Sequence, residues 1–262
     1  DLVNKPEHHK LWSDAMASPV DDEGQYYHPL YFACNDFVDD EIGRVIRHLD
    51  QGEIENTWGI YTSDHGGMMG AHKLVSKGAA MYDDITNIPL IVRQPKQKGE
   101  FPAAGQQIDT PVSHIDILPT MMRLAGIEQP DMLPGAELLS VMTKEVERSV
   151  MVEFNRYEVE HDSFGGFIPV RCWITPDFKL VINLFTSDEL YDRKNDKDEL
   201  NNLIHDPDYA ELRDKLHDQL MDYMDAIRDP FRSYQWSMRP WRKGVKPRWM
   251  GSFRPRPNDG YS

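Results

Sequence analysis

The amino-acid sequence predicts an α/β fold followed by a small α+β subdomain with an antiparallel sheet. Three observations support this prediction. Apolar runs typical of strands alternate with helical spacing up to about residue 147. Short β-rich runs follow from about residue 148, and a helical pattern comes after them. We therefore expect a large α/β region 1–147, a subdomain 148–234 and a distinct segment 235–262.

The first predicted helix follows an irregular start. Residues 1–25 show no periodicity, so we expect a loop there. Pro29 suits a first helical turn, and apolar residues recur every three or four positions from Cys34 to Leu49. This spacing predicts an amphipathic helix with Cys34 in the core.

Two strands and a second helix complete the first region. Residues 57–62 are expected to form a buried strand, and residues 88–93 a second strand. Ser113 can cap a helix that should stop at Gly126. His114, at the start of that helix, is interpreted as a capping or packing residue.

The subdomain is predicted to be an antiparallel meander covered by a helix. Its β-rich runs are residues 149–152, 170–174 and 179–182. A helical pattern from about Tyr209 places leucines on one face, ready to cover the sheet. The histidines with polar neighbours and no ligand spacing are interpreted as surface residues; these are His161, His205 and His217.

Segment 235–262 is basic and aromatic, with seven basic residues, three tryptophans and one acid. A basic aromatic tail can indicate nucleic-acid binding. The favoured interpretation is an extended arm that docks on the acidic body or on another subunit and buries Trp236, Trp241 and Trp249. A homo-oligomer formed through this arm is therefore one expectation.

Composition limits the class of protein. The chain has 262 residues, 40% of them hydrophobic, which suffices for one large or two smaller domains. Its formal charge of −15 argues against nucleic acid as a partner. No apolar run approaches the ~20 residues that span a bilayer, and two cysteines exclude a disulfide framework. We expect a soluble protein without a membrane partner, either cytoplasmic or exported to the periplasm.

The most informative motif is Asp64-His65-Gly66, which directly follows an apolar run ending at Tyr61. A carboxylate and an imidazole at the carboxyl end of a strand can hold a divalent cation. Lys77, thirteen positions after Asp64, could neutralise an anionic group bound to that cation. The pattern predicts a metal-assisted site for a sulfate or phosphate ester within a metal and substrate loop at residues 61–80.

With its neighbouring segments, this motif resembles the sulfatase branch of the alkaline phosphatase superfamily. The matching segments, in order, are Phe37-Val38-Asp39-Asp40-Glu41-Ile42-Gly43, Thr62-Ser63-Asp64-His65-Gly66 with Gly70-Ala71-His72 and Ser76-Lys77-Gly78, Ile88-Pro89-Leu90-Ile91-Val92, Ser113-His114-Ile115-Asp116-Ile117-Leu118-Pro119-Thr120, and Glu189-Leu190-Tyr191-Asp192 through Leu203. The resemblance runs from about Tyr26 to about Arg228. It implies part of an alkaline-phosphatase-like mixed sheet flanked by helices, and a small C-terminal α+β subdomain with an antiparallel sheet.

The resemblance also implies roles for four residues. Asp64 and His65 would be metal ligands, and Lys77 would contact the sulfate or phosphate oxygens of a small ester substrate. His72 matches a recurrent family position, where it could face the substrate or hydrogen-bond the loop. The resemblance makes Ca²⁺ the first choice for a single divalent cation, although an imidazole ligand suits Mn²⁺ or Zn²⁺ better.

Two departures from the family pattern shape the functional prediction. Many sulfatases carry Asn where this chain has His65, and the Asp-His form also occurs in phosphonate and phosphodiester hydrolases. The Cys-x-Pro-x-Arg type motif that yields the formylglycine nucleophile has no match around Cys34 or Cys172. We therefore expect the rear half of a longer enzyme, inactive alone, whose partner is the missing N-terminal half.

Three functions remain open on the sequence alone. The first is a formylglycine-type, metal-dependent sulfatase, and the second is a phosphodiester or phosphonate monoester hydrolase with the same metal site. The third is a non-enzymatic pseudoenzyme module that is stabilised by a metal and acts through its tail.

Overall fold

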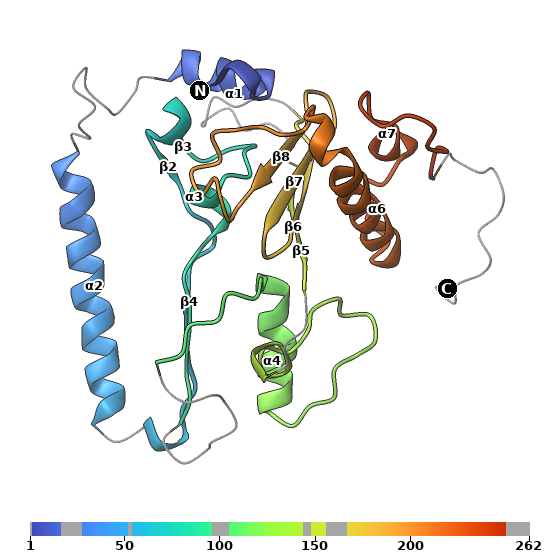
Figure 1. The fold of residues 1–262 in the computed structure, drawn as a ribbon. Helices are drawn as coiled ribbons and strands as arrows, with labels where there is room; N and C mark the ends of the chain where they lie inside the picture. The colour runs from blue at the N-terminus through green and yellow to red at the C-terminus, as the bar shows by residue number, and fades with distance from the viewer. Residues whose placement is uncertain are drawn as a thin grey trace.

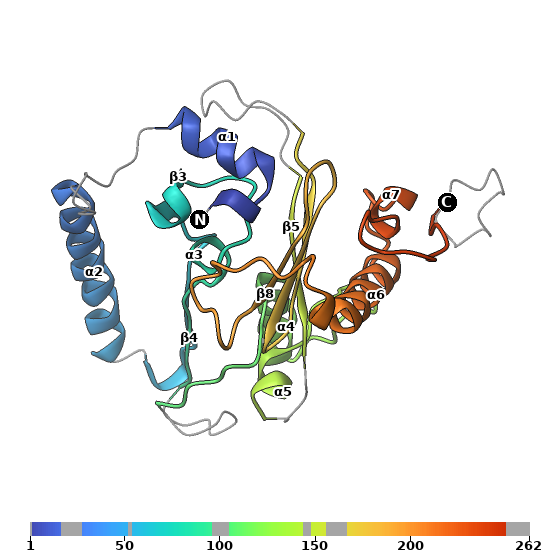
Figure 2. The same ribbon diagram turned by 45° about the horizontal axis from the view of Figure 1, so that its top comes forward.

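A computed structural model describes residues 2–16, 28–51, 54–95, 105–143, 148–155 and 167–249. A four-stranded sheet occupies the middle of the molecule (Figures 1 and 2). A long helix, α2 (Pro29–Asp50), lies at one edge, and two helices of the C-terminal part, α6 (Ala210–Ala226) and α7 (Tyr234–Ser237), lie at the opposite edge. None of the helices in these ranges is long and apolar enough to cross a membrane.

The start of the chain is helical, which corrects the predicted loop at residues 1–25. A 3₁₀ turn, η1 (Leu2–Asn4), leads into helix α1 (Glu7–Ala15). Two residues one helical turn apart, His9 and Trp12, are buried there. One histidine and one tryptophan form the buried face of this short helix, which is too little for an apolar periodicity in the sequence. Residues 17–25 lie outside the described part of the chain.

Helix α2 confirms the predicted helix but not its burial. Cys34 is exposed, and Val38 and Val45 are 52% and 62% exposed. The prediction of Cys34 as a core residue is therefore wrong for the described chain. Amphipathic spacing shows that a helix has an apolar face, but no described element covers that face here.

The two predicted strands of the first region pair with each other. β1 (Gly59–Thr62) and β4 (Leu90–Arg93) are antiparallel, with Thr62 opposite Leu90. A 3₁₀ turn, η2 (Ile54–Asn56), precedes β1. The strand β1 is half-buried rather than buried, and Tyr61 is 44% exposed. With two strands and no described layer on its outer face, this ribbon leaves part of its apolar surface open.

The loop between these strands contains a small hairpin. β2 (Met68–Met69) pairs with β3 (Val75–Ser76), and the turn η3 (Ala71–Lys73) joins them. A short helix, α3 (Asp83–Thr86), returns the chain to β4.

The predicted helix after Ser113 is confirmed, as is its stop. It begins as a 3₁₀ turn, η4 (His114–Asp116), and continues as α4 (Ile117–Leu124). The Ser113 amide donates to Oδ2 of Asp116 at 2.8 Å in a capping box. Gly126 follows with φ +72°, a left-handed conformation that ends helices. A further helix, α5 (Leu138–Thr143), comes next.

The predicted meander is confirmed and has a fourth strand. β5 (Val150–Phe154), β6 (Val170–Ile174), β7 (Phe178–Asn183) and β8 (Glu189–Asp192) pair in sequence order, all antiparallel. Successive side chains of β6 alternate between the faces of the sheet, as the pleat requires. On one face Trp173 packs with Leu216 and Leu220 of α6, and on the other Cys172 packs with Met81.

The arm docks on its own subdomain as far as residue 249. Trp236 of α7 is fully buried, and Trp241 and Trp249 pack against the same core. A 3₁₀ turn, η6 (Pro207–Tyr209), opens α6, whose acidic face pairs with the arm. Arg242 donates to Asp218 at 2.6 Å, for example. Contact with another subunit stays a prediction, and residues 250–262 lie outside the described part.

His217 is buried rather than on the surface, which corrects the prediction. Its Nε2 lies 2.8 Å from the Trp236 carbonyl, and its Nδ1 lies 2.7 Å from a guanidinium nitrogen of Arg242. The arm thus covers the histidine that local sequence suggested would be solvated. His205 is exposed, as predicted, and His161 lies outside the described residues.

Candidate functional site

Asp64 lies in the tight turn that immediately follows β1. Its Oδ1 accepts the His65 amide at 2.9 Å, and the side chain is 80% exposed. The hydrogen bond from the His65 amide is the first cause that holds the pKa of Asp64 below its usual value. The carboxylate is therefore ionised and open to a cation.

The ring of His65 is oriented by the backbone. Its Nδ1 lies 2.7 Å from the Gly66 carbonyl, which can only accept, so the ring proton belongs on Nδ1. Nε2 then presents a lone pair, 3.3 Å from Oδ2 of Asp64. Two electron-pair donors face each other, which is the arrangement that a cation would bridge.

Lys77 supplies the positive charge at this point. Its Nζ lies 3.1 Å from Nε2 of His65. Lys77 follows β3 directly, so the hairpin brings it back to the turn after β1 although it lies twelve positions after His65 in the sequence. The structure thus brings together three of the four predicted site residues.

His72, the fourth candidate, lies elsewhere. It is 8% exposed, and its ring stacks on Tyr82 with centroids 3.8 Å apart and planes at 11°. Burial, and next the charge of Lys5, lower the pKa of His72 to about 4. A neutral, stacked ring with a left-handed backbone (φ 52°) indicates a role in shaping the loop. Contact with the substrate and a hydrogen bond to the loop, the two roles expected for His72, both stay predictions.

Two neighbours fix the backbone of the turn. Nε2 of His114 lies 2.7 Å from the carbonyl oxygen of Ser63, the residue before Asp64. The Gly66 amide donates to the Ile85 carbonyl at 2.9 Å. A side chain at Gly66 would collide with the Asp84 carbonyl, so this close approach requires glycine. His114 therefore packs against the site, a role that its place beside a helix cap did not reveal.

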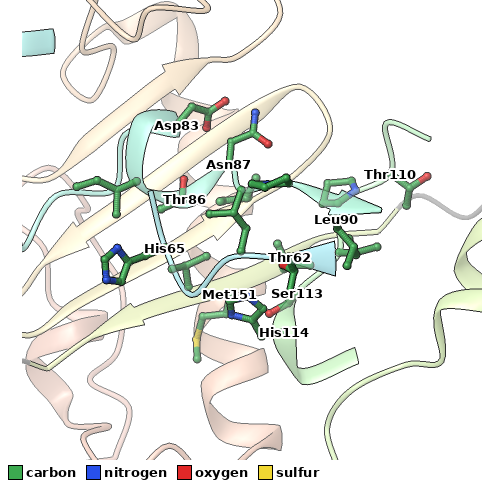
Figure 3. Close-up of a pocket in the computed structure, with 18 of the residues that line it drawn as sticks. Thr62, His65, Asp83, Thr86, Asn87, Leu90, Thr110, Ser113, His114 and Met151 are labelled. Atoms are coloured by element: carbon green, nitrogen blue, oxygen red, sulfur yellow. The ribbon is translucent and has the colours of Figure 1, made fainter. Parts of the chain in front are cut away.

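Asp64, His65, Lys77 and His114 line one cavity of about 1870 Å³. Figure 3 shows this cavity, with Thr62 and His65 coming from the end of β1 and Ser113 and His114 from the segment before α4. Met151 of β5 lies on the wall as well, so the β1–β4 ribbon and the four-stranded sheet both contribute to the cavity. His72 is not among its lining residues.

The donors fit part of a divalent-cation site. A carboxylate oxygen and an imidazole lone pair are common metal ligands, and backbone contacts orient both here. Across the described ranges, no group of three or more His, Cys, Asp or Glu side chains is arranged to hold a metal ion. Asp64 and His65 can thus supply two ligands of a larger set.

Comparison with known families decides what kind of protein this is. Residues 6–127 match the sulfatase family, and residues 70–226 match the C-terminal part of N-sulphoglucosamine sulphohydrolase. The chain belongs to the sulfatase family. The predicted membership in the alkaline phosphatase superfamily is confirmed by these matches and by structural neighbours.

One similar protein is an uncharacterized sulfatase of Escherichia coli, YidJ. It is 72% identical over 262 residues, which is the whole of this chain and 51% of that protein. This sulfatase chain spans about half the length, or less, of the curated relatives that it matches.

Solved structures confirm the predicted fold class. One is a protein in complex with its substrate D-glucosamine-2-N,6-O-disulfate, with TM-score 0.62, 30% identity, and coverage of 74% of this chain and 39% of that one. Another is the phosphonate monoester hydrolase of Agrobacterium radiobacter, with TM-score 0.62, 28% identity, and coverage of 72% and 39%.

Proposed function

We propose that this chain forms part of a sulfatase that hydrolyses sulfate esters with the help of one divalent cation. Asp64 and His65 would hold the cation, and Lys77 would contact the sulfate. One geometric observation supports this proposal. Nε2 of His65 lies 3.3 Å from Oδ2 of Asp64 and 3.1 Å from Nζ of Lys77, so the three side chains meet at one point. Ca²⁺ remains the first candidate, with Mn²⁺ or Zn²⁺ favoured by the imidazole ligand.

The residues of this chain would act by position and charge. The turn presents the Asp64 carboxylate ionised, and the Gly66 carbonyl keeps the His65 lone pair available. The ammonium of Lys77 would neutralise negative charge on the sulfuryl oxygens, which is worth more in a cavity than in bulk water. The cation, when bound, would act as a Lewis acid on the ester oxygen. The nucleophile, formylglycine by resemblance, would lie outside these 262 residues.

A sugar sulfate is the substrate class that fits best. One similar structure holds D-glucosamine-2-N,6-O-disulfate, and a relative with 32% identity is named N-acetylglucosamine-6-O-sulfatase. The cavity of about 1870 Å³ is lined by Lys77, and a sugar ring would lie in it beside that residue.

A phosphonate monoester or phosphodiester is the second candidate substrate. His65 stands where many sulfatases have Asn, and the Agrobacterium phosphonate monoester hydrolase is a structural neighbour. Both readings use the same metal ligands and the same lysine, so they differ in the substrate alone.

Matched assays on the complete enzyme test the proposal. We expect 4-nitrophenyl sulfate to be hydrolysed faster than 4-nitrophenyl phenylphosphonate and bis(4-nitrophenyl) phosphate. Removal of the metal with a chelator should stop turnover, and adding Ca²⁺ or Mn²⁺ back should restore it. The reverse order of rates would favour the phosphonate hydrolase. Absence of turnover on all three esters, with metal bound, would favour the pseudoenzyme.

A further inference from the structure

Helix α1 contacts the segment that carries Lys77 on both sides of that residue. On the amino-terminal side, the indole Nε1 of Trp12 donates to the Val75 carbonyl at 3.1 Å. Trp12 is 2% exposed and belongs to a core cluster with Leu74. The hydrogen bond therefore fixes the backbone two residues before Lys77.

On the carboxyl-terminal side, the same indole packs against Gly78. A Cβ at Gly78 would lie 3.0 and 3.1 Å from two atoms of the Trp12 six-membered ring. This spacing is tighter than ordinary van der Waals contact, so the indole or the backbone would have to shift by a few tenths of an ångström to admit a side chain. Glycine at position 78 lets helix α1 approach the backbone next to Lys77.

Two adjacent histidines of helix α1, His8 and His9, contact Ala79, the residue after Gly78. Nε2 of His8 lies 2.7 Å from the Ala79 carbonyl, and Nε2 of His9 lies 3.3 Å from it. A carbonyl only accepts, so the ring proton of His8 belongs on Nε2. Nδ1 of His8 lies 3.1 Å from the Thr186 hydroxyl, and Nδ1 of His9 lies 3.1 Å from the Tyr82 hydroxyl. The rings thus tie Ala79 to the rest of the protein.

Lys77 needs such support more than a rigid side chain would. Its four-carbon stem is flexible, so the place of its ammonium depends on the place of its backbone. Ser76 precedes it with φ +67°, a left-handed conformation that a non-glycine residue holds only when its surroundings impose it. The contacts at Val75, Gly78 and Ala79 hold the backbone on both sides of Ser76.

We propose that Trp12 and His8 are positioning residues that set where the Lys77 ammonium lies relative to His65. The proposal rests on the proposed function of Lys77 as the contact to the sulfate. It assigns a role in the site to helix α1, whose own residues do not line the cavity.

A double-mutant cycle between Gly78 and Trp12 tests the proposal in the complete enzyme. Gly78→Ala should push the indole and displace the Lys77 segment by a few tenths of an ångström. We expect kcat/KM for 4-nitrophenyl sulfate to fall about tenfold, since a 1 Å misplacement can cost about a hundredfold. Trp12→Phe removes the outer ring atoms and the N–H and should cost a few-fold. The double variant should match Trp12→Phe alone, because the collision has been removed.

Two further measurements separate positioning from a loss of folding. Inhibition by inorganic sulfate should weaken in Gly78→Ala in step with kcat/KM, whereas bound metal per protein should stay at the wild-type level. Leu11→Ala, at a 61% exposed position of the same helix, is the matched control and should behave as wild type.

Each contrary result has a defined meaning. Wild-type kcat/KM and sulfate inhibition in Gly78→Ala would overturn the proposal, as would a double variant whose defect equals the product of the single defects. Wild-type turnover in Lys77→Ala would instead overturn the proposed function, and the inference with it.

Discussion

The Nζ atom of Lys77 lies 3.1 Å from the Nε2 atom of His65. Because Nδ1 of this ring faces the Gly66 carbonyl, Nε2 is the atom with the free electron pair, and the ammonium donates to it. A metal ion would need the same electron pair. Binding of a cation should therefore displace Lys77 from His65 and leave its ammonium free to pair with an anion bound at the metal.

Substitution of the two charged residues separates metal binding from contact with the substrate. Asp64→Ala should abolish metal binding, since it removes one of the two ligands that this chain supplies. Lys77→Ala should retain the metal and lower kcat by about 10² to 10³, the usual cost of one preorganised charge-stabilising donor. Elemental analysis of the purified enzyme and steady-state kinetics measure the two effects.

Asp109→Ala is the control for that experiment. Asp109 is exposed on the wall of the same cavity, so its loss removes the same charge and should leave the metal content unchanged. Full metal content and full activity in Asp64→Ala would contradict the assignment of the site.

Adjacent glycines in the turn should respond differently to a methyl group. A Cβ at Gly66 would collide with the Asp84 backbone, whereas one at Gly67 would meet the Ser76 carbonyl at an ordinary 3.6 Å. Gly66→Ala should lower the free energy of unfolding by about 1–3 kcal/mol and weaken metal binding, because the turn must move. Gly67→Ala should change neither. Urea unfolding and metal titration of both variants measure this, and equal behaviour of the pair would contradict the close approach at Gly66.

The sequence predicted what local patterns encode. Strand β4, the helix cap at Ser113 and the meander were all visible as spacing or as cap and turn residues. The burial of a side chain was less predictable, because it depends on which other segment of the chain packs against it. Cys34 has an apolar helical position but no described neighbour to cover it, and His217 has polar neighbours in sequence yet lies under the arm.

In the site, too, the sequence predicted local motifs but not contacts between distant segments. Asp64 and His65 form a contiguous motif, and Lys77 lies close enough in sequence for a hairpin to return it. Trp12 is more than sixty residues away from Val75, and its contact depends on the packing of two separate segments. A short helix with a histidine pair gives no periodic signal of that contact.

A buried ion-pair cluster joins the site loop to the central sheet. The Lys179 ammonium is fully buried, 2.5 Å from Oδ1 of Asp83 and 2.6 Å from Oε1 of Glu199. Burial disfavours its charge, but the carboxylates of Glu199 and Asp83 outweigh that effect and raise the pKa of Lys179. Nζ also donates to the Met81 carbonyl at 2.8 Å, so the cluster holds the chain just before α3.

Lys179→Met should therefore cost about 3–5 kcal/mol of unfolding free energy, because it leaves two carboxylates without their buried partner. Lys197→Met, at an exposed position, should change stability by no more than about 0.5 kcal/mol. Guanidinium unfolding followed by circular dichroism measures both. Equal midpoints for the two variants would show that the cluster contributes little to stability.

Stability should also fall in mild acid because three buried histidines, His9, His72 and His217, and the half-buried His8 are neutral rings in the folded chain. Burial is the first cause that lowers the pKa of His8, His72 and His217 to about 4 and that of His9 to about 3. The unfolded chain binds protons near pH 6.5, where the folded chain does not. The free energy of unfolding should thus be constant above about pH 7.5 and decrease as pH falls from about 6.5 towards 4. Thermal unfolding at a series of pH values measures this slope.

His217→Gln should reduce that slope. Nε2 of His217 faces the Trp236 carbonyl, and Nδ1 accepts from Arg242; a glutamine amide offers one donor and one acceptor without titrating. At pH 7.5 the variant should be somewhat less stable than wild type, because the longer side chain fits the cavity less well. The difference in unfolding free energy between wild type and His217→Gln should become smaller at pH 5, because wild type loses the stability that depends on a neutral ring. His205→Gln, at an exposed position of the same subdomain, should keep the wild-type slope. If the difference in unfolding free energy between wild type and His217→Gln stayed constant from pH 7.5 to 5, His217 would not take up a proton on unfolding.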